Sequence, residues 1–132
     1  MITFTGSGAV GWKLRERSPC KRVNLELGNA TPVIVEADAD IDVAATKLAA
    51  NAFSFAGQSC ISVQRIYVQR SVYDDFKASF LPRVEALNVG DPADESTEMV
   101  PLISSGQRDI VASFVRSNAP ALVRGNAPAG KG

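Results

Sequence analysis

Histidine is absent from this 132-residue chain, and cysteine occurs only twice, as Cys20 and Cys60. The absence of histidine excludes Ser-His-Asp and Cys-His catalytic arrangements and most zinc sites. Two cysteines are too few for a disulfide framework or a metal cluster, and we expect both thiols to be reduced, as in a cytoplasmic protein. Covalent chemistry must therefore depend on cysteine, serine, lysine or carboxylate side chains.

A net charge and long apolar runs are also missing. Basic and acidic residues number 14 each and are spread along the chain, so no basic stripe indicates a nucleic-acid partner. The apolar runs are far shorter than a membrane span, and no secretory leader is evident, so we expect no membrane partner and a cytoplasmic location. Hydrophobic residues make up 45% of the chain, which suffices for the core of one modest domain or of part of a larger one.

Apolar periodicity predicts short strands that alternate with helices. The strands are expected at residues 2–5, 22–27, 33–35 and 64–70, with a further one at 121–124; the helices are expected at about 9–17, 41–56, 71–87 and 105–117, and residues 125–132 as a frayed tail. This alternation predicts an α/β fold with parallel strand pairing, although strands this sparse rarely complete a sheet by themselves.

Local signals refine these expectations. The continuous apolar run at 33–35 predicts a strand that is buried on both faces. Asp40 or Asp42 is expected to cap the helix that follows, and Gly57 to end it. Ser71 is expected to cap the next helix, and Pro82 to kink it or end it early.

The first candidate site is the glycine pattern from Gly6 to Gly11, which reads G-x-G-x-x-G between a strand and a helix. Backbone N–H groups in such a turn can hold a phosphate. Glu26 lies 20 residues beyond Gly6, where a dinucleotide-binding fold places its ribose-binding acid. The alternative is a plain strand-to-helix turn that needs glycine for its geometry.

The second candidate is Cys60, which follows the expected helix stop and is surrounded by Gln58, Ser59 and Ser62. A lone cysteine is more often a small buried apolar residue, and a lone glutamate such as Glu26 on the polar face of a strand is usually a solvated charge. The negative end of the preceding helix dipole would also disfavour a thiolate. Activation would have to come from backbone donors, cofactor charge or a nearby base.

Several motifs, taken in order, resemble the aldehyde dehydrogenase superfamily. They are Phe4-Thr5-Gly6-Ser7, Leu25-Glu26-Leu27-Gly28 and Ala56-Gly57-Gln58-Ser59-Cys60. The stretches 60–68, 73–76 and 89–92 are similar to the branch that includes lactaldehyde and other short-chain aldehyde dehydrogenases. The resemblance extends to about Ser104, and three ordered motifs are more specific than any one of them.

The resemblance implies an oxidoreductase that oxidises a small aldehyde to a carboxylic acid with NAD or NADP, through a cysteine thiohemiacetal and a thioester. It implies Cys60 as the nucleophile and Glu26 as the general base for deacylation. It assigns Gly6, Ser7, Gly11 and Leu27 to cofactor binding, with Gly11 in the same loop as the first two, and implies no metal. The parent family is homo-oligomeric.

The resemblance further implies a fragment of the aldehyde dehydrogenase fold: the end of the nucleotide-binding sheet and the first part of the catalytic α/β domain. We expect residues 1–24 to end the coenzyme-binding domain, 25–124 to begin the catalytic domain and 125–132 to form a tail. One departure is Leu27-Gly28-Asn29, where Leu-Gly-Gly is usual, and we interpret it as tolerated.

Other family residues have no counterpart here: the asparagine of the oxyanion hole, the lysine on the adenosine ribose and the Glu-x-Phe segment on the nicotinamide ribose. We therefore expect little or no dehydrogenase activity from the 132 residues alone. The alternatives are a non-catalytic truncated fragment or interaction module, and an ordinary dinucleotide-binding fold. The ordinary fold predicts Glu26 at a strand end beside Gly6, and the dehydrogenase predicts Glu26 in a cleft opposite Cys60.

Overall fold

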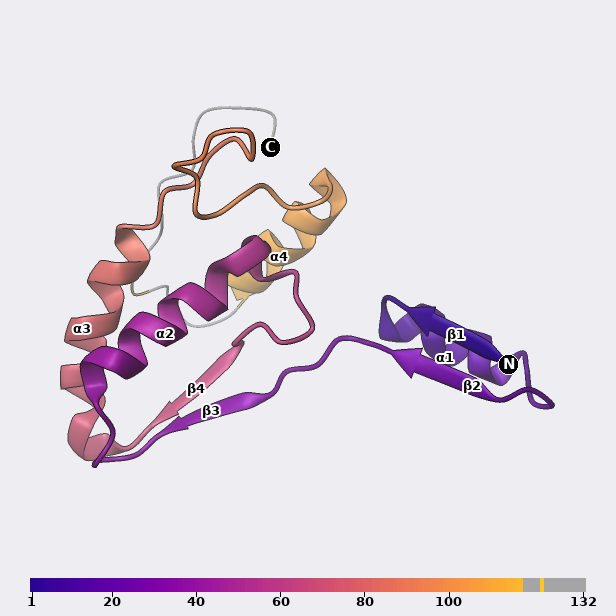
Figure 1. Cartoon of the computed structure of the whole chain (residues 1–132), viewed down its shortest axis with the longest axis horizontal. Helices are drawn as coiled ribbons and strands as arrows, with labels where there is room; N and C mark the ends of the chain where they lie inside the picture. The colour runs from indigo at the N-terminus through magenta and orange to yellow at the C-terminus, as the bar shows by residue number, and fades with distance from the viewer. Residues whose placement is uncertain (118–121, 123–132) are drawn as a thin grey trace.

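The computed structural model describes residues 1–117 and residue 122, and it contains two α/β units joined by an extended segment (Figure 1). The first unit consists of β1 (Ile2–Thr5), α1 (Gly8–Glu16) and β2 (Val23–Glu26). The second consists of β3 (Pro32–Val35), α2 (Ile41–Phe53), β4 (Arg65–Val68) and α3 (Tyr73–Glu85), and a loop then leads to α4 (Ser105–Ser117). Strands β1 and β2 pair in parallel, as do β3 and β4, which confirms the expected α/β class and parallel pairing.

In the first unit, helix α1 packs closely on the strand pair at Gly11. Gly11 is buried, and a Cβ atom built on it would lie 2.6 Å from Leu27 Cδ2 and 3.4 Å from the ring of Phe4. A glycine at this position therefore lets the helix approach the sheet more closely than any other residue would. The same contact places the start of α1 next to the carboxyl ends of β1 and β2.

The core of the second unit lies between its two strands and helices α2 and α3. Four residues form its buried centre: Val35, Ala45, Leu48 and Phe76. Phe80 stacks on Phe76 with ring centroids 5.2 Å apart. Burial of these side chains against one another supplies the main stabilisation of the unit.

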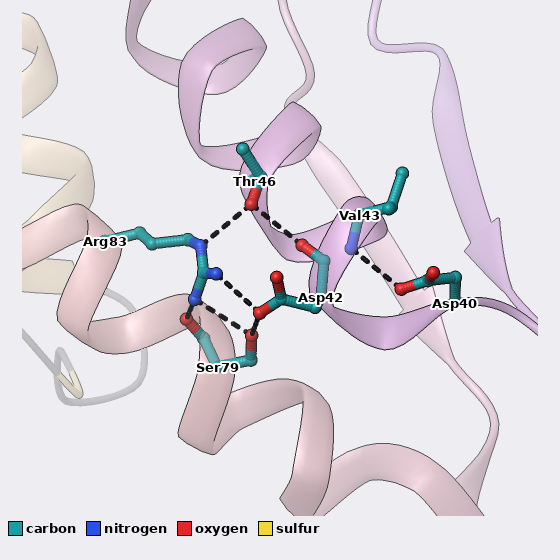
Figure 2. A network of polar contacts seen from close by, with 6 residues as sticks. All are labelled: Asp40, Asp42, Val43, Thr46, Ser79 and Arg83. Atoms are coloured by element: carbon teal, nitrogen blue, oxygen red, sulfur yellow. Dashed lines mark hydrogen bonds and ion pairs between the residues drawn. The ribbon is translucent and has the colours of Figure 1, made fainter.

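Polar contacts also join α2 to α3, as Figure 2 shows. The guanidinium of Arg83 pairs with Asp42 and donates to Thr46 Oγ1 at 3.0 Å and to the Ser79 carbonyl at 2.6 Å. Asp40 caps α2 by accepting a hydrogen bond from the Val43 N–H at 3.0 Å, which confirms one of the two expected caps.

The expectation that residues 33–35 are buried on both faces is wrong. Val35 is buried, but Ile34 is 67% exposed, and its partner on β4, Tyr67, is 58% exposed. The core cluster contains only alternate residues of β3 and β4, and these face α2 and α3. Nothing in the described part of the chain covers the opposite face of the two strands. A continuous apolar strand thus presents one apolar face to solvent.

Three helix boundaries differ from expectation. Helix α2 ends at Phe53 and does not reach Ala56, because the chain turns into left-handed backbone there. Ser71 lies in a short 3-10 turn and does not cap α3, whose N-cap position is taken by Val72. Helix α3 continues past Pro82 to Glu85, so the early stop is wrong. Burial of Val84 beyond the proline favours continuation of the helix.

Helix α4 has the expected bounds, Ser105–Ser117. The expected domain boundary after residue 24 falls inside β2, and the division into domains stays a prediction. Apart from residue 122, the strand expected at 121–124 and the tail at 125–132 lie outside the described residues. Within residues 1–117, no helix is long and apolar enough to span a membrane.

Candidate active-site cleft

A cleft of about 600 Å³ is lined by the carboxyl ends of β1 and β2, the start of α1 and the turn around Cys60. Of the residues expected to form a site, it brings together Gly6, Ser7, Glu26, Leu27 and Cys60. A pocket of this size falls in the range that binds small molecules and parts of cofactors. The five residues come from three separate stretches of the sequence, so their meeting is a product of the fold.

Gly11 does not line the cleft. Helix α1 begins at Gly8, so the expectation that Gly11 shares a loop with Gly6 and Ser7 is wrong. Gly11 instead lies under Leu27, where its missing side chain lets α1 and β2 touch. Gly11 thus packs behind Leu27, and Leu27 itself lines the cleft.

The strand register places Glu26 beside the glycine turn. Thr5 and Glu26 are partners at the carboxyl ends of β1 and β2, and the Gly6 N–H donates to the Glu26 carbonyl at 3.0 Å. Glu26 is exposed and shares the cleft with Cys60. An ordinary dinucleotide fold predicts Glu26 at a strand end beside Gly6, and a dehydrogenase predicts Glu26 in a cleft with Cys60. The observed position of Glu26 satisfies both predictions, so it does not separate the two folds.

The start of α1 supplies donors to the same cleft. Ser7 is the N-cap residue, and its side chain makes no capping hydrogen bond, while Gly6, Ser7 and Gly8 all line the cleft. The first turn of the helix contains no acidic residue. A helix start with free N–H groups carries partial positive charge and favours an anionic group such as a phosphate.

Cys60 follows an unusual left-handed turn. Phe55 has φ 51° and ψ 33°, Ala56 has φ 56° and ψ 33°, and Gly57 has φ 73°. The Gln58 N–H closes this turn by donating to the Phe55 carbonyl at 3.1 Å. Sequence analysis did not predict the turn, since two of its three residues have side chains that disfavour this backbone region.

Cys60 carries a free thiol and a backbone N–H that is unpaired within the described residues. The cysteine is exposed and unpaired, and within the described residues its N–H has no hydrogen-bond acceptor. Behind it, Ser62 is buried and its hydroxyl donates to the Ala52 carbonyl at 3.2 Å. The turn thus rests on the end of α2 and directs Cys60 toward the cleft.

Side-chain amides tie the Cys60 turn to two distant segments. Asn29 Nδ2 donates to the Cys60 carbonyl, and Gln64 Nε2 donates to the Asn29 carbonyl at 2.8 Å. Gln58 Oε1 accepts from the Ile103 N–H at 2.9 Å, just before α4. The sequence did not predict a role for Asn29. The one signal that pointed to it is that Asn29 stands where the usual Leu-Gly-Gly has its second glycine.

Metal binding has no support in the described part of the chain, where no three histidine, cysteine, aspartate or glutamate residues form a group that could hold an ion. The groups that line the cleft are a thiol, a carboxylate and a set of backbone N–H donors. These three groups suit acyl transfer through a thioester.

Comparison with known sequences places this arrangement in a family. The sequence model of the Aldehyde dehydrogenase family matches residues 1–127. The chain is 42% identical over 116 residues to 3-sulfolactaldehyde dehydrogenase from Priestia aryabhattai, covering 88% of this chain and 24% of the relative. It is 45% identical over 115 residues to lactaldehyde dehydrogenase from Methanocaldococcus jannaschii, covering 87% of this chain and 25% of the relative.

Solved structures agree with the sequence comparison. Glyceraldehyde-3-phosphate dehydrogenase GapN from Methanocaldococcus jannaschii, complexed with NADP, superposes with a TM-score of 0.85 at 42% identity, over 88% of this chain and 25% of that one. Betaine aldehyde dehydrogenase from Staphylococcus aureus, in complex with NAD+, gives a TM-score of 0.82 at 32% identity, over 86% and 23%. The chain spans about a quarter of the length of these relatives. By sequence and by fold, the chain belongs to the aldehyde dehydrogenase family.

Proposed function

We propose that this chain supplies the nucleophile and the base of an NAD(P)-dependent aldehyde dehydrogenase that oxidises a small aldehyde to a carboxylic acid. The observation that carries the proposal is the cleft itself, which gathers Cys60, Glu26 and the Gly6-Ser7 turn. The relatives named for sulfolactaldehyde and lactaldehyde support a short-chain aldehyde as the substrate class.

In the first half of the reaction, the Cys60 thiolate attacks the aldehyde carbon. A C–S bond forms, the carbonyl π electrons move to oxygen, and the resulting thiohemiacetal oxyanion accepts a hydrogen bond from the Cys60 N–H. That N–H suits the role because it has no acceptor within the described residues. A bound NAD(P)+ would supply the hydride acceptor for the oxidation, and Cys60 would then hold the oxidised acyl group as a thioester.

In the second half, Glu26 acts as general base. Its carboxylate takes a proton from a water molecule as the water oxygen attacks the thioester carbon, and the C–S bond breaks to release the carboxylic acid and the Cys60 thiolate. An exposed carboxylate at the end of β2 can reach solvent water, as this role requires.

The residues present fit a dinucleotide cofactor, and we propose NAD or NADP. The fit rests on the donor set, because the start of α1 presents the N–H groups of an uncapped helix N-terminus to the cleft. Gly6 and Ser7 would hold a phosphate there, and Leu27 would offer an apolar wall. Gly11 would act only indirectly, by bringing α1 against Leu27.

The 132 residues span about a quarter of their relatives, so we propose that alone they show little or no aldehyde dehydrogenase activity. The test therefore uses acyl transfer from p-nitrophenyl acetate to the isolated chain, which requires no cofactor. The thiolate attacks the ester carbon, the C–S bond forms, and p-nitrophenolate leaves. Mass spectrometry of the two cysteine peptides measures where the acetyl group resides.

We expect Cys60 to be acetylated at least about tenfold faster than Cys20, which is also an exposed thiol and serves as the internal control. Glu26→Gln should leave acetylation intact and slow hydrolysis of the acetyl-enzyme by about a hundredfold. Equal acetylation of the two cysteines would support the alternative of a non-catalytic fragment. Robust NADH formation by the isolated chain would overturn the proposed dependence on further segments.

A further inference from the structure

We propose that Asn29 is a positioning residue for Cys60: its side-chain amide fixes the backbone of the nucleophile so that the thiol and the Cys60 N–H act on the same carbonyl group. The inference rests on the proposed function, in which Cys60 is the nucleophile. It assigns a role to a residue that is notable in the sequence only because it replaces the second glycine of the usual Leu-Gly-Gly.

The contacts of Asn29 determine how its amide is oriented. Its Oδ1 accepts two hydrogen bonds from Thr31, one from the N–H at 3.0 Å and one from Oγ1 at 2.8 Å. Because oxygen is the only acceptor of an asparagine amide, these two donors leave Nδ2 on the opposite side. There Nδ2 donates to the carbonyl of Cys60, 31 positions further along the chain.

The bond to the Cys60 carbonyl fixes the peptide plane on one side of the nucleophile. On the other side of the same residue, the N–H has no acceptor within residues 1–117 and remains available to an oxyanion. If the carbonyl were free to rotate, the residue could turn its thiol and its N–H away from a common target. Holding catalytic groups in one geometry is a substantial source of rate acceleration.

Asn29 also sets the spacing between nucleophile and base. Its own carbonyl accepts from Gln64 Nε2 at 2.8 Å, so the extended segment after β2 is attached both to the Cys60 turn and to the chain that leaves it. Glu26 lies only three residues before Asn29. The short segment from Glu26 to Asn29 therefore keeps the Glu26 carboxylate and the Cys60 thiol at one cleft, although the two residues belong to different units.

The test compares acetylation with alkylation of the same thiol. Acetylation by p-nitrophenyl acetate builds an oxyanion and needs the Cys60 N–H, whereas iodoacetamide alkylates by displacement of iodide at a saturated carbon and needs no such donor. Asn29→Ala removes the amide without adding charge. Asn29→Asp keeps an oxygen acceptor for Thr31 and removes the donor to Cys60. The two hydrogen bonds from Thr31 can therefore still form and hold the local turn.

Asn51→Asp is the matched control. The Asn51 amide likewise donates to a backbone carbonyl, that of Lys47 at 2.8 Å, but it lies on an exposed face of α2 and does not line the cleft. We expect both Asn29 variants to acetylate Cys60 about tenfold more slowly than the wild type, with the alkylation rate of Cys60 in Asn29→Ala within about twofold of it. The Asn51 variant should match the wild type in both reactions.

Three outcomes would overturn the inference in different ways. If acetylation and alkylation fall together in Asn29→Ala, Asn29 only maintains the fold of the turn. If the wild type acetylates Cys60 selectively and both Asn29 variants do so equally well, Asn29 has no positioning role while the proposed function stands. If the wild type itself does not favour Cys60 over Cys20, the proposed function fails, and with it the role of Asn29.

Discussion

The left-handed turn before Cys60 leads to a stability prediction at Phe55. This residue adopts φ 51° and ψ 33° although it has a side chain, and its side chain is 71% exposed. A non-glycine residue in this region costs about 1–2 kcal/mol, and asparagine tolerates it better than most residues. Phe55→Asn should therefore relieve strain at little cost in packing.

The magnitude follows from two opposing terms. Full burial of a phenylalanine side chain is worth about 1.5–3 kcal/mol, so the smaller part of Phe55 that is covered contributes about 0.5–1 kcal/mol. Relief of most of the left-handed penalty outweighs this loss, and we expect Phe55→Asn to stabilise the chain by about 0.5 kcal/mol. Phe55→Ala loses the same packing but keeps the penalty, so it should destabilise by about 0.5–1 kcal/mol.

The assay is urea unfolding of the three proteins followed by far-ultraviolet circular dichroism, with the free energies compared at a common slope. The decisive quantity is the difference between the asparagine and alanine variants, about 1 kcal/mol, because both have lost the aromatic ring. Equal stability of the two variants would refute the reasoning, since strain in the backbone at residue 55 would then contribute nothing.

Three further predictions concern other parts of the chain. Gly11→Ala should destabilise by about 1–2 kcal/mol in urea unfolding, because its Cβ would meet Leu27 at 2.6 Å, whereas Gly8→Ala, with only a 3.9 Å contact, should not. Arg83→Ala should lower the free energy of unfolding by about 1 kcal/mol and lose part of this effect in high salt. Hydrogen bonds from the Ser96 N–H and hydroxyl hold the pKa of Asp94 below its ordinary value, so its contribution to stability is present above that ordinary value and is lost as the pH falls through the lowered pKa. Ser96→Ala should raise the Asp94 pKa part of the way back, as an NMR titration of the carboxyl carbon would show.

Local features of the fold were predictable because a short stretch of sequence determines them. The Asp40 cap and the bounds of α4 follow from residue types within one or two turns of a helix. The alternation of β2 placed Leu25 on the covered face and Glu26 on the exposed one, as the structure shows. The ordered motifs identified the family before any geometry was known.

Features that depend on distant partners were not predictable. No local propensity indicates that Phe55 and Ala56 adopt left-handed backbone, because the turn is imposed by the contacts around it. The exposure of Ile34 depends on which layers cover the sheet, and an apolar run alone does not give that. The Asn29–Cys60 hydrogen bond joins segments that only the folded chain brings together.

The uneven distribution of buried residues between the two units has a consequence for cooperativity. The buried hydrophobic core lies entirely in β3, α2 and α3, whereas in residues 1–26 only Gly11 is buried. Regions with few buried contacts open at lower free energy than the core. Backbone amides of β1 and β2 should therefore exchange with deuterium faster than those of β4 and α2. Because Glu26 belongs to the weaker unit and Cys60 to the stronger one, mild denaturant should separate these two proposed catalytic residues before most of the helical signal is lost.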